Sequence, residues 1–86
     1  MHFEFSIAAC RFTMEQPPRH VLTGHFTLRL GDKRGRVLAV GPSSGSVIHF
    51  ARQYAKAPQL FEEVGVLFLD GNGSIYTAAG RPGRTA

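Results

Sequence analysis

Apolar and polar side chains alternate along the beginning of the chain. The odd positions carry Phe3, Phe5 and Ile7, whereas the even positions between them are polar. This period of two is typical of a β-strand with one buried face. The alternation changes phase at residues 9–11, where apolar residues move to even positions. We therefore predict a first strand over residues 2–12 that ends or bulges at this point.

A second alternating segment leads into the clearest turn of the sequence. Leu22, Phe26 and Leu28 share one side of the extended chain, and residues 31–35 follow as a polar stretch with glycine at both ends. Such a stretch suits a hairpin loop, so residues 36–40 should form the antiparallel partner strand. The opposite, polar face of the sheet would carry Glu4, Ser6, Thr23, His25, Thr27 and Arg29.

The spacing of apolar residues becomes helical after residues 41–46, a turn rich in glycine and serine. Val47, Ala51 and Tyr54 recur at intervals of three to four residues, as on the buried stripe of an amphipathic helix. A serine of the turn is expected to cap the helix by accepting from its first backbone amides. Pro58 should end the helix, because the residue before a proline disfavours the helical conformation.

The last third of the chain predicts a second hairpin. After one more helical turn within residues 59–64, residues 66–69 form a short, entirely apolar run that is typical of a buried strand. Residues 70–73 have the sequence Asp-Gly-Asn-Gly, which favours a tight turn because Asn and Gly tolerate positive φ angles. Residues 74–77 should return as the last strand.

These elements predict an α+β fold in the order β-β-β-α-β-β. We expect a five-stranded antiparallel sheet with one main helix packed on its apolar face. With 86 residues and 43% hydrophobic content, the chain can form one compact core. We assign residues 1–79 to a single domain and residues 80–86 to a flexible C-terminal tail.

Cysteine content and charge indicate the setting in which the chain works. Cys10 is the only cysteine, so no disulfide can form within the chain, and we expect a reducing, cytoplasmic environment. No apolar run approaches the roughly 18 residues of a membrane-spanning helix. The formal net charge of +4 favours acidic partners, which are nucleic acids or acidic protein surfaces.

Several fragments of known site motifs are present, but each lacks a residue that the chemistry needs. The turn 41–46 lacks the lysine of a phosphate-binding loop, which leaves only weak anion binding at the helix amides open. Residues 70–75 lack the flanking carboxylates of a calcium loop. The four histidines and Cys10 show no zinc-ligand spacing, and no histidine and carboxylate are placed to activate the thiol. We therefore predict no catalytic residues, no metal site and no cofactor.

The basic residues remain as the feature that predicts a function. They form two groups, one around the hairpin loop of residues 31–35 and one at helical spacing on the polar side of the predicted helix. Arginine suits phosphates and carboxylates equally well, although loop tips and outer helix faces also carry charge without any partner. The candidate binding residues are Arg29, Lys33, Arg34, Arg36, His49, Arg52, Gln53 and Lys56.

Our leading hypothesis is a small, non-enzymatic protein that makes stoichiometric contact with an acidic protein surface through the first hairpin and the polar sheet face. By analogy of size and class alone, one such role is inhibition of a host nucleic-acid-processing or defence complex, as phages and other mobile elements inhibit CRISPR systems. The alternative is a nucleic-acid-binding module that uses the same basic hairpin and helix face. A third hypothesis is an enzyme or metal protein whose site is assembled across a dimer. A homodimer could form through a sheet edge or the polar sheet face, because an open sheet leaves two unpaired edges.

Overall fold

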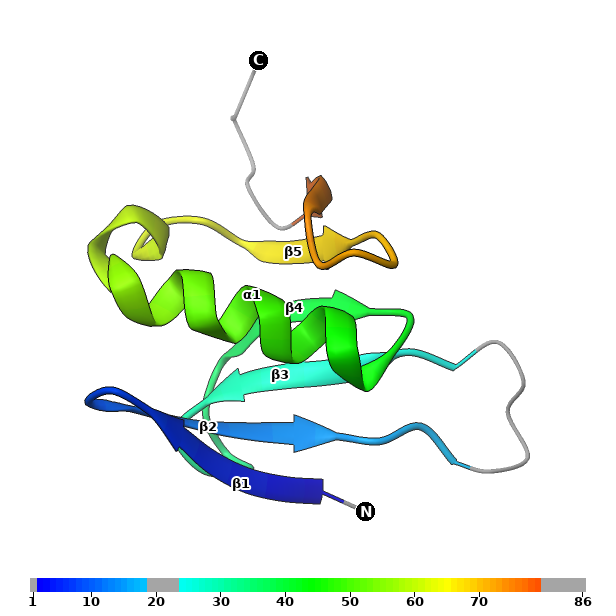
Figure 1. The fold of residues 1–86 in the computed structure, drawn as a ribbon, viewed down its shortest axis with the longest axis horizontal. Coiled ribbons are helices and arrows are strands. Elements are labelled where there is room, and N and C mark those ends of the chain that lie inside the picture. Colours follow the sequence, from blue (N-terminus) through cyan, green and yellow to red (C-terminus); the bar gives the residue numbers. More distant parts are fainter. Residues whose placement is uncertain (1, 19–23, 80–86) are drawn as a thin grey trace.

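The computed structural model describes residues 2–18 and 24–79, in which one helix covers one face of a mixed sheet (Figure 1). The elements in chain order are β1 (His2–Ile7), β2 (Cys10–Glu15), β3 (Phe26–Leu30), β4 (Val37–Gly41), α1 (Ser44–Lys56), the 3-10 helix η1 (Pro58–Phe61), β5 (Val66–Leu69) and β6 (Ile75–Ala79). These six strands lie side by side in the same order as in the sequence. The predicted α+β class is confirmed, but the prediction of five antiparallel strands needs two corrections.

The first correction concerns the beginning of the chain, where one predicted strand is two. β1 and β2 pair antiparallel with Ile7 opposite Cys10, so Ala8 and Ala9 alone form the turn. Ala8 has a φ of 54°, in the left-handed region that tight hairpin turns use. Because paired residues share a sheet face, the turn moves the apolar positions from odd numbers in β1 to even numbers in β2. The change of phase in the sequence is therefore a hairpin turn: β1 ends here, as one of the two predicted alternatives had it, and no bulge is needed.

The second correction concerns strand direction. β4 and β5 pair in parallel, with Ala39 opposite Leu67 and Val40 opposite Phe68, whereas the other neighbouring strands of the described residues are antiparallel. The chain leaves β4, runs back along the sheet as α1 and enters β5 in the direction of β4 (Figure 1). A helical crossover of this kind is the usual connection between parallel strands. The helix between β4 and β5 thus makes β5 parallel to β4, which the prediction of an antiparallel sheet missed.

The hairpin between β3 and β4 forms at the predicted loop, but β3 begins at Phe26, so His25, which was expected on the polar sheet face, precedes the strand. The loop of residues 31–35 joins the two antiparallel strands, and the Leu30 amide donates to the Arg36 carbonyl at 3.0 Å. Leu22 and Thr23, which the sequence analysis assigned to this strand, lie outside the described residues.

α1 begins with the predicted serine cap. The Ser43 hydroxyl accepts from the Ser46 amide at 3.2 Å, and the Ser46 hydroxyl accepts from the Ser43 amide at 3.3 Å. This reciprocal cap satisfies amides that would otherwise lack a helical partner. The helix ends at Lys56, and Pro58 opens η1, so the predicted end before the proline and the further helical turn are both confirmed.

The core lies between α1 and the sheet face that carries the apolar strand positions. Its buried apolar residues are Phe12, Met14, Leu28, Leu38, Ala39, Val47, Phe50, Ala51, Tyr54, Leu67 and Leu69. Phe5, Ile7 and Phe26 pack against this core as predicted, although each is only partly buried. Phe3 was expected in the same set, but it is 46% exposed.

The hairpin between β5 and β6 confirms the predicted turn. The Oδ1 atom of Asp70 accepts from the backbone amides two and four residues later, at 2.8 and 3.0 Å. Gly73 has a φ of 85°, and a Cβ atom on it would lie 2.9 Å from His49 of α1, so the turn packs closely on the helix. Residues 80–86, where a flexible tail was predicted, lie outside the described residues.

Candidate binding surfaces

The charged residues of the sheet lie on the face opposite α1, which we call the open face. Its strand residues include Glu4, Ser6, Arg11, Thr13, Glu15, Thr27 and Arg29. Arg11 lies 2.9 Å from Glu4, and Arg29 lies 2.8 Å from Glu15. Each pair joins neighbouring strands, so the charges of the open face are balanced within the sheet.

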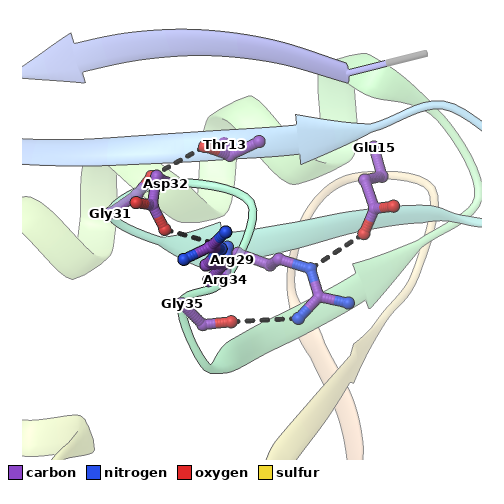
Figure 2. Close-up of polar contacts among 7 residues, drawn as sticks. All are labelled: Thr13, Glu15, Arg29, Gly31, Asp32, Arg34 and Gly35. Atoms are coloured by element: carbon purple, nitrogen blue, oxygen red, sulfur yellow. Dashed lines mark hydrogen bonds and ion pairs between the residues drawn. The ribbon is translucent and has the colours of Figure 1, made fainter.

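Arg29 is one of the most constrained candidate binding residues. Its guanidinium extends along the open face (Figure 2), where Nε donates to Glu15 and Nη1 donates to the Gly35 carbonyl at 2.9 Å. Its side chain is 28% exposed, compared with 63% for Arg11. Arg29 therefore links β2 to the loop of residues 31–35, and its guanidinium is already bonded within the fold.

The loop of residues 31–35 lies over the open face and buries it at Thr13. The Thr13 side chain is fully buried, and its hydroxyl donates to the Gly31 carbonyl at 2.7 Å. At the loop tip, the Asp32 carboxylate accepts from the Arg34 amide at 2.8 Å (Figure 2). The exposed residues of this tip are Asp32, Lys33 and Arg34. The carboxylate in the tip offsets part of its positive charge.

Arg36 is also bonded within the fold. Its Nη2 atom donates to the Phe61 carbonyl at 3.2 Å, and its Nη1 atom donates to the Val64 carbonyl at 3.5 Å. The Phe61 carbonyl at the end of η1 also accepts from the Val64 amide at 3.4 Å, and a basic side chain can add a second hydrogen bond to such a carbonyl. Arg36 thus links the start of β4 to the connection between α1 and β5.

The outer face of α1 also carries positive charge, but its basic side chains differ from those of the hairpin in their bonding. We call its exposed polar residues the basic stripe: His49, Arg52, Gln53 and Lys56. Their spacing places them on one side of the helix, over a length of about 10 Å. The helix contains no acidic residue, and within the described ranges neither Arg52 nor Lys56 forms an ion pair. In these ranges Arg52 and Lys56 therefore keep their positive charges without a direct ion pair.

The two groups of basic residues do not form one continuous patch. The basic stripe lies on the helix side of the sheet, whereas Arg29 and the loop of residues 31–35 lie on the open face (Figures 1 and 2). The sheet separates them, so they are two candidate surfaces. The sequence alone could not show this, because the order of residues does not say which face a loop covers.

Thr13 and Glu15 are important residues that the sequence analysis missed. Both belong to β2 (Cys10–Glu15), whose first residues were assigned to the predicted strand 2–12 and whose last three were assigned to no strand. Once the turn at Ala8 and Ala9 is assigned, the register places Thr13 opposite Arg29, with Glu15 two residues further along β2. The signal that could have found them was therefore the phase change, interpreted as a hairpin.

The groups considered for catalysis and metal binding lie apart. Glu4 is on the open face, whereas Cys10 pairs with Ile7 and packs against the core. The Asp70 carboxylate accepts from amides of its own turn. Among the residues that the structure describes, no three His, Cys, Asp or Glu side chains lie close enough together to hold a metal ion.

No protein-family model, curated protein or solved structure matches the chain. Over the described ranges, no helix has both the length and the apolar character needed to cross a membrane. A proposal of function therefore rests on the contacts, burial and charge of the described surfaces.

Proposed function

We propose that the protein acts without catalysis, by stoichiometric contact between the basic stripe and an acidic surface of a macromolecular partner. Arg52 offers a planar, permanently charged guanidinium, and Lys56 offers a compact ammonium group. His49 and Gln53 add shorter polar side chains that can donate hydrogen bonds beside these charges. Such a set suits a surface of carboxylates.

The observation that carries this proposal is the uneven distribution of charge. Glu4 and Glu15 are each bonded to an arginine of the sheet, and Arg29 and Arg36 are bonded to backbone carbonyls. In the described part of the chain, the basic stripe has no such carboxylate partner. An unbalanced positive surface attracts acidic partners and speeds their association.

The basic stripe is also held rigidly, which lowers the entropy lost on binding. The inner face of α1 buries Phe50, Ala51 and Tyr54 in the core, and the reciprocal serine cap fixes the start of the helix. A helix anchored in this way presents its outer side chains in a preorganised arrangement.

Within this proposal, the partner is a host nucleic-acid-processing or defence complex, and the protein inhibits it by covering an acidic surface. The support for this finer step is the small fold and its unbalanced helix, together with analogy of size and class. We propose the cytoplasm as the setting, since a small chain with a single cysteine is usual in a reducing compartment.

The experiment that tests the proposal compares the two candidate surfaces on one partner. The partner is first identified by affinity capture from host cells, and binding to the purified partner is then measured by calorimetry. We expect a fixed stoichiometry and at least a tenfold loss of affinity, about 1.4 kcal/mol, for the double variant Arg52→Glu and Lys56→Glu.

The matched control changes the same number of charges on the loop tip. Lys33→Glu combined with Arg34→Glu should change the affinity much less, because it leaves the basic stripe intact. An unchanged affinity in the helix variant, with circular dichroism showing that it is folded, would remove the basic stripe from the proposal. A larger loss of affinity in the loop variant would show that the hairpin, not the basic stripe, makes the contact.

Nucleic acid is the second candidate partner, and the absence of acidic residues from α1 favours it as well. A phosphate backbone would release counterions from such a surface, so the logarithm of the affinity would fall linearly with the logarithm of the salt concentration. Fluorescence anisotropy with labelled single-stranded and duplex oligonucleotides at low and moderate salt distinguishes the two. Steep salt dependence that the Arg52→Glu and Lys56→Glu variant abolishes would favour nucleic acid.

A further inference from the structure

The two edge strands of the described sheet differ in how open they are. β6 pairs with β5 through an irregular register at Phe68 and Leu69, and irregularities of this kind hinder further strand pairing. β1 pairs with β2 without a register shift over its whole length. On its free side, every second residue of a regular edge strand presents an unpaired N–H and C=O.

β1 also carries an exposed apolar side chain on this edge. Phe3 belongs to the sheet face that α1 covers, yet it is 46% exposed. Its neighbour on the same face, Phe5, is half-buried and stacks on Phe12 with the ring centroids 5.4 Å apart. β1 contains neither proline nor lysine, residues that commonly block an edge. A further strand beside β1 would satisfy the backbone groups and bury Phe3 in one step.

We infer that two copies of this chain pair antiparallel through β1, in the register that places Phe5 opposite Phe5 of the second copy. Phe3 then lies opposite Ile7 of the second copy, and Glu4 lies opposite Ser6. Aromatic pairs and pairs of aromatic with β-branched residues are favourable across neighbouring strands. The strand is thus complementary to itself.

Two other registers would also keep the apolar faces of the two copies on the same side of the sheet. Like charges exclude one of them, and the small number of paired residues excludes the other. One step towards the N-terminus, Glu4 would lie opposite Glu4 of the second copy, and like charges directly opposite each other are destabilising. One step in the other direction leaves only residues 5–7 of each strand paired. The register centred on Phe5 pairs residues 3–7 and places no two like charges opposite each other.

The pairing has a geometric consequence for α1. In this register each residue meets one of the same sheet face, so both copies of α1 lie on the same side of one continuous sheet. The dimer does not depend on the proposed function. If that function holds, however, one partner surface would meet two basic stripes, which raises the effective concentration of the second contact.

Sedimentation equilibrium over a range of protein concentrations tests the dimer, with one substitution on each edge strand. We expect the unaltered chain to sediment as a reversible dimer. Phe3→Lys should raise the dissociation constant at least tenfold, because it places a charge in the interface. Ile75→Lys is the matched control, since Ile75 is 51% exposed on the other edge strand, and it should leave the dissociation constant unchanged.

Cross-linking tests the register and does not depend on the folding of the Phe3→Lys variant. In a Cys10→Ser background, a chain with Glu4→Cys is mixed with a chain with Ser6→Cys under mild oxidation. The mixed disulfide should form faster than either symmetrical disulfide. A monomer at every concentration, an equal effect of Ile75→Lys, or preferential linkage of Glu4→Cys to itself would each overturn the inference.

Discussion

Gly73 holds the turn between β5 and β6 against α1. Its φ of 85° lies in the left-handed region, and a Cβ atom would lie 2.7 Å from the Ser46 carbonyl oxygen and 2.9 Å from the Cβ of His49. Gly71, in the same turn, has no neighbouring atom within 4 Å of a Cβ position. The local sequence does not distinguish the two glycines, whereas in the structure both the left-handed backbone and the close approach of α1 require glycine at residue 73.

We expect Gly73→Ala to lower the free energy of unfolding by about 2 kcal/mol. The left-handed conformation costs a residue with a Cβ roughly 1–2 kcal/mol, and the contacts with α1 add to this. Gly71→Ala is the control and should change stability by less than about 0.5 kcal/mol. Urea denaturation followed by circular dichroism measures both, and equal effects would contradict the close packing of the turn on α1.

At the scale of elements, the hairpin of β3 and β4 depends on contacts with β2. Arg29 donates to both Glu15 and the Gly35 carbonyl, whereas Arg11 forms one exposed pair with Glu4. The two arginines are chemically identical, but Arg29 is half-buried under the loop. The difference in burial and in the number of bonds decides which of them stabilises the fold.

Replacing each arginine with methionine should separate these roles. Arg29→Met loses two hydrogen bonds and leaves Glu15 without its partner, so we expect a loss of about 1–2 kcal/mol in the free energy of unfolding. Arg11→Met should cost about 0.5 kcal/mol or less, as is usual for an exposed ion pair. Thermal or urea unfolding of the two variants gives the comparison, and a larger effect for Arg11→Met would contradict the assigned role of Arg29.

At the scale of the whole molecule, helix and sheet share one core. The Tyr54 ring of α1 meets the Phe12 ring of β2 edge-on with centroids 5.8 Å apart, and it stacks on Phe61 of η1 at 5.4 Å. Elements that share buried rings in this way lose their packing together. The fold should therefore unfold in one cooperative transition.

Phe50→Ala tests this shared core. The side chain is 2% exposed, and its truncation should cost about 3–5 kcal/mol, which approaches the total stability of roughly 5 kcal/mol expected for a domain of this size. Leu60→Ala, at a residue 69% exposed, should change stability by less than about 0.5 kcal/mol. For the unaltered chain, tyrosine fluorescence and far-ultraviolet circular dichroism should give the same midpoint, and two separate transitions would contradict a single core.

The candidate site was only partly predictable from the sequence. The exposure of the basic stripe followed from helical spacing, because residues three and four apart share a helix face. The bonds of Arg29 and Arg36 did not follow, since their partners are up to 28 residues away along the chain. Whether a charged side chain is available to bind a partner depends on such bonds. The cluster of basic residues in the sequence therefore suggested a larger binding surface around the hairpin than the structure has.

Features that arise between near neighbours could be predicted from the amino-acid sequence. These are the strand periods, the serine cap of α1, the end of α1 before Pro58 and the two hairpins with loops at residues 31–35 and 70–73. The parallel pairing of β4 with β5 and the face that each basic group occupies were settled only in the folded molecule. The hairpin at Ala8 has a local signal, the change of phase, but its register was fixed by the pairing of β1 with β2. The two kinds of feature differ in how far apart along the chain the interacting residues lie. Local conformation depends on residues within about one turn, whereas strand pairing, burial and the pairing of charges depend on segments that meet only once the chain has folded.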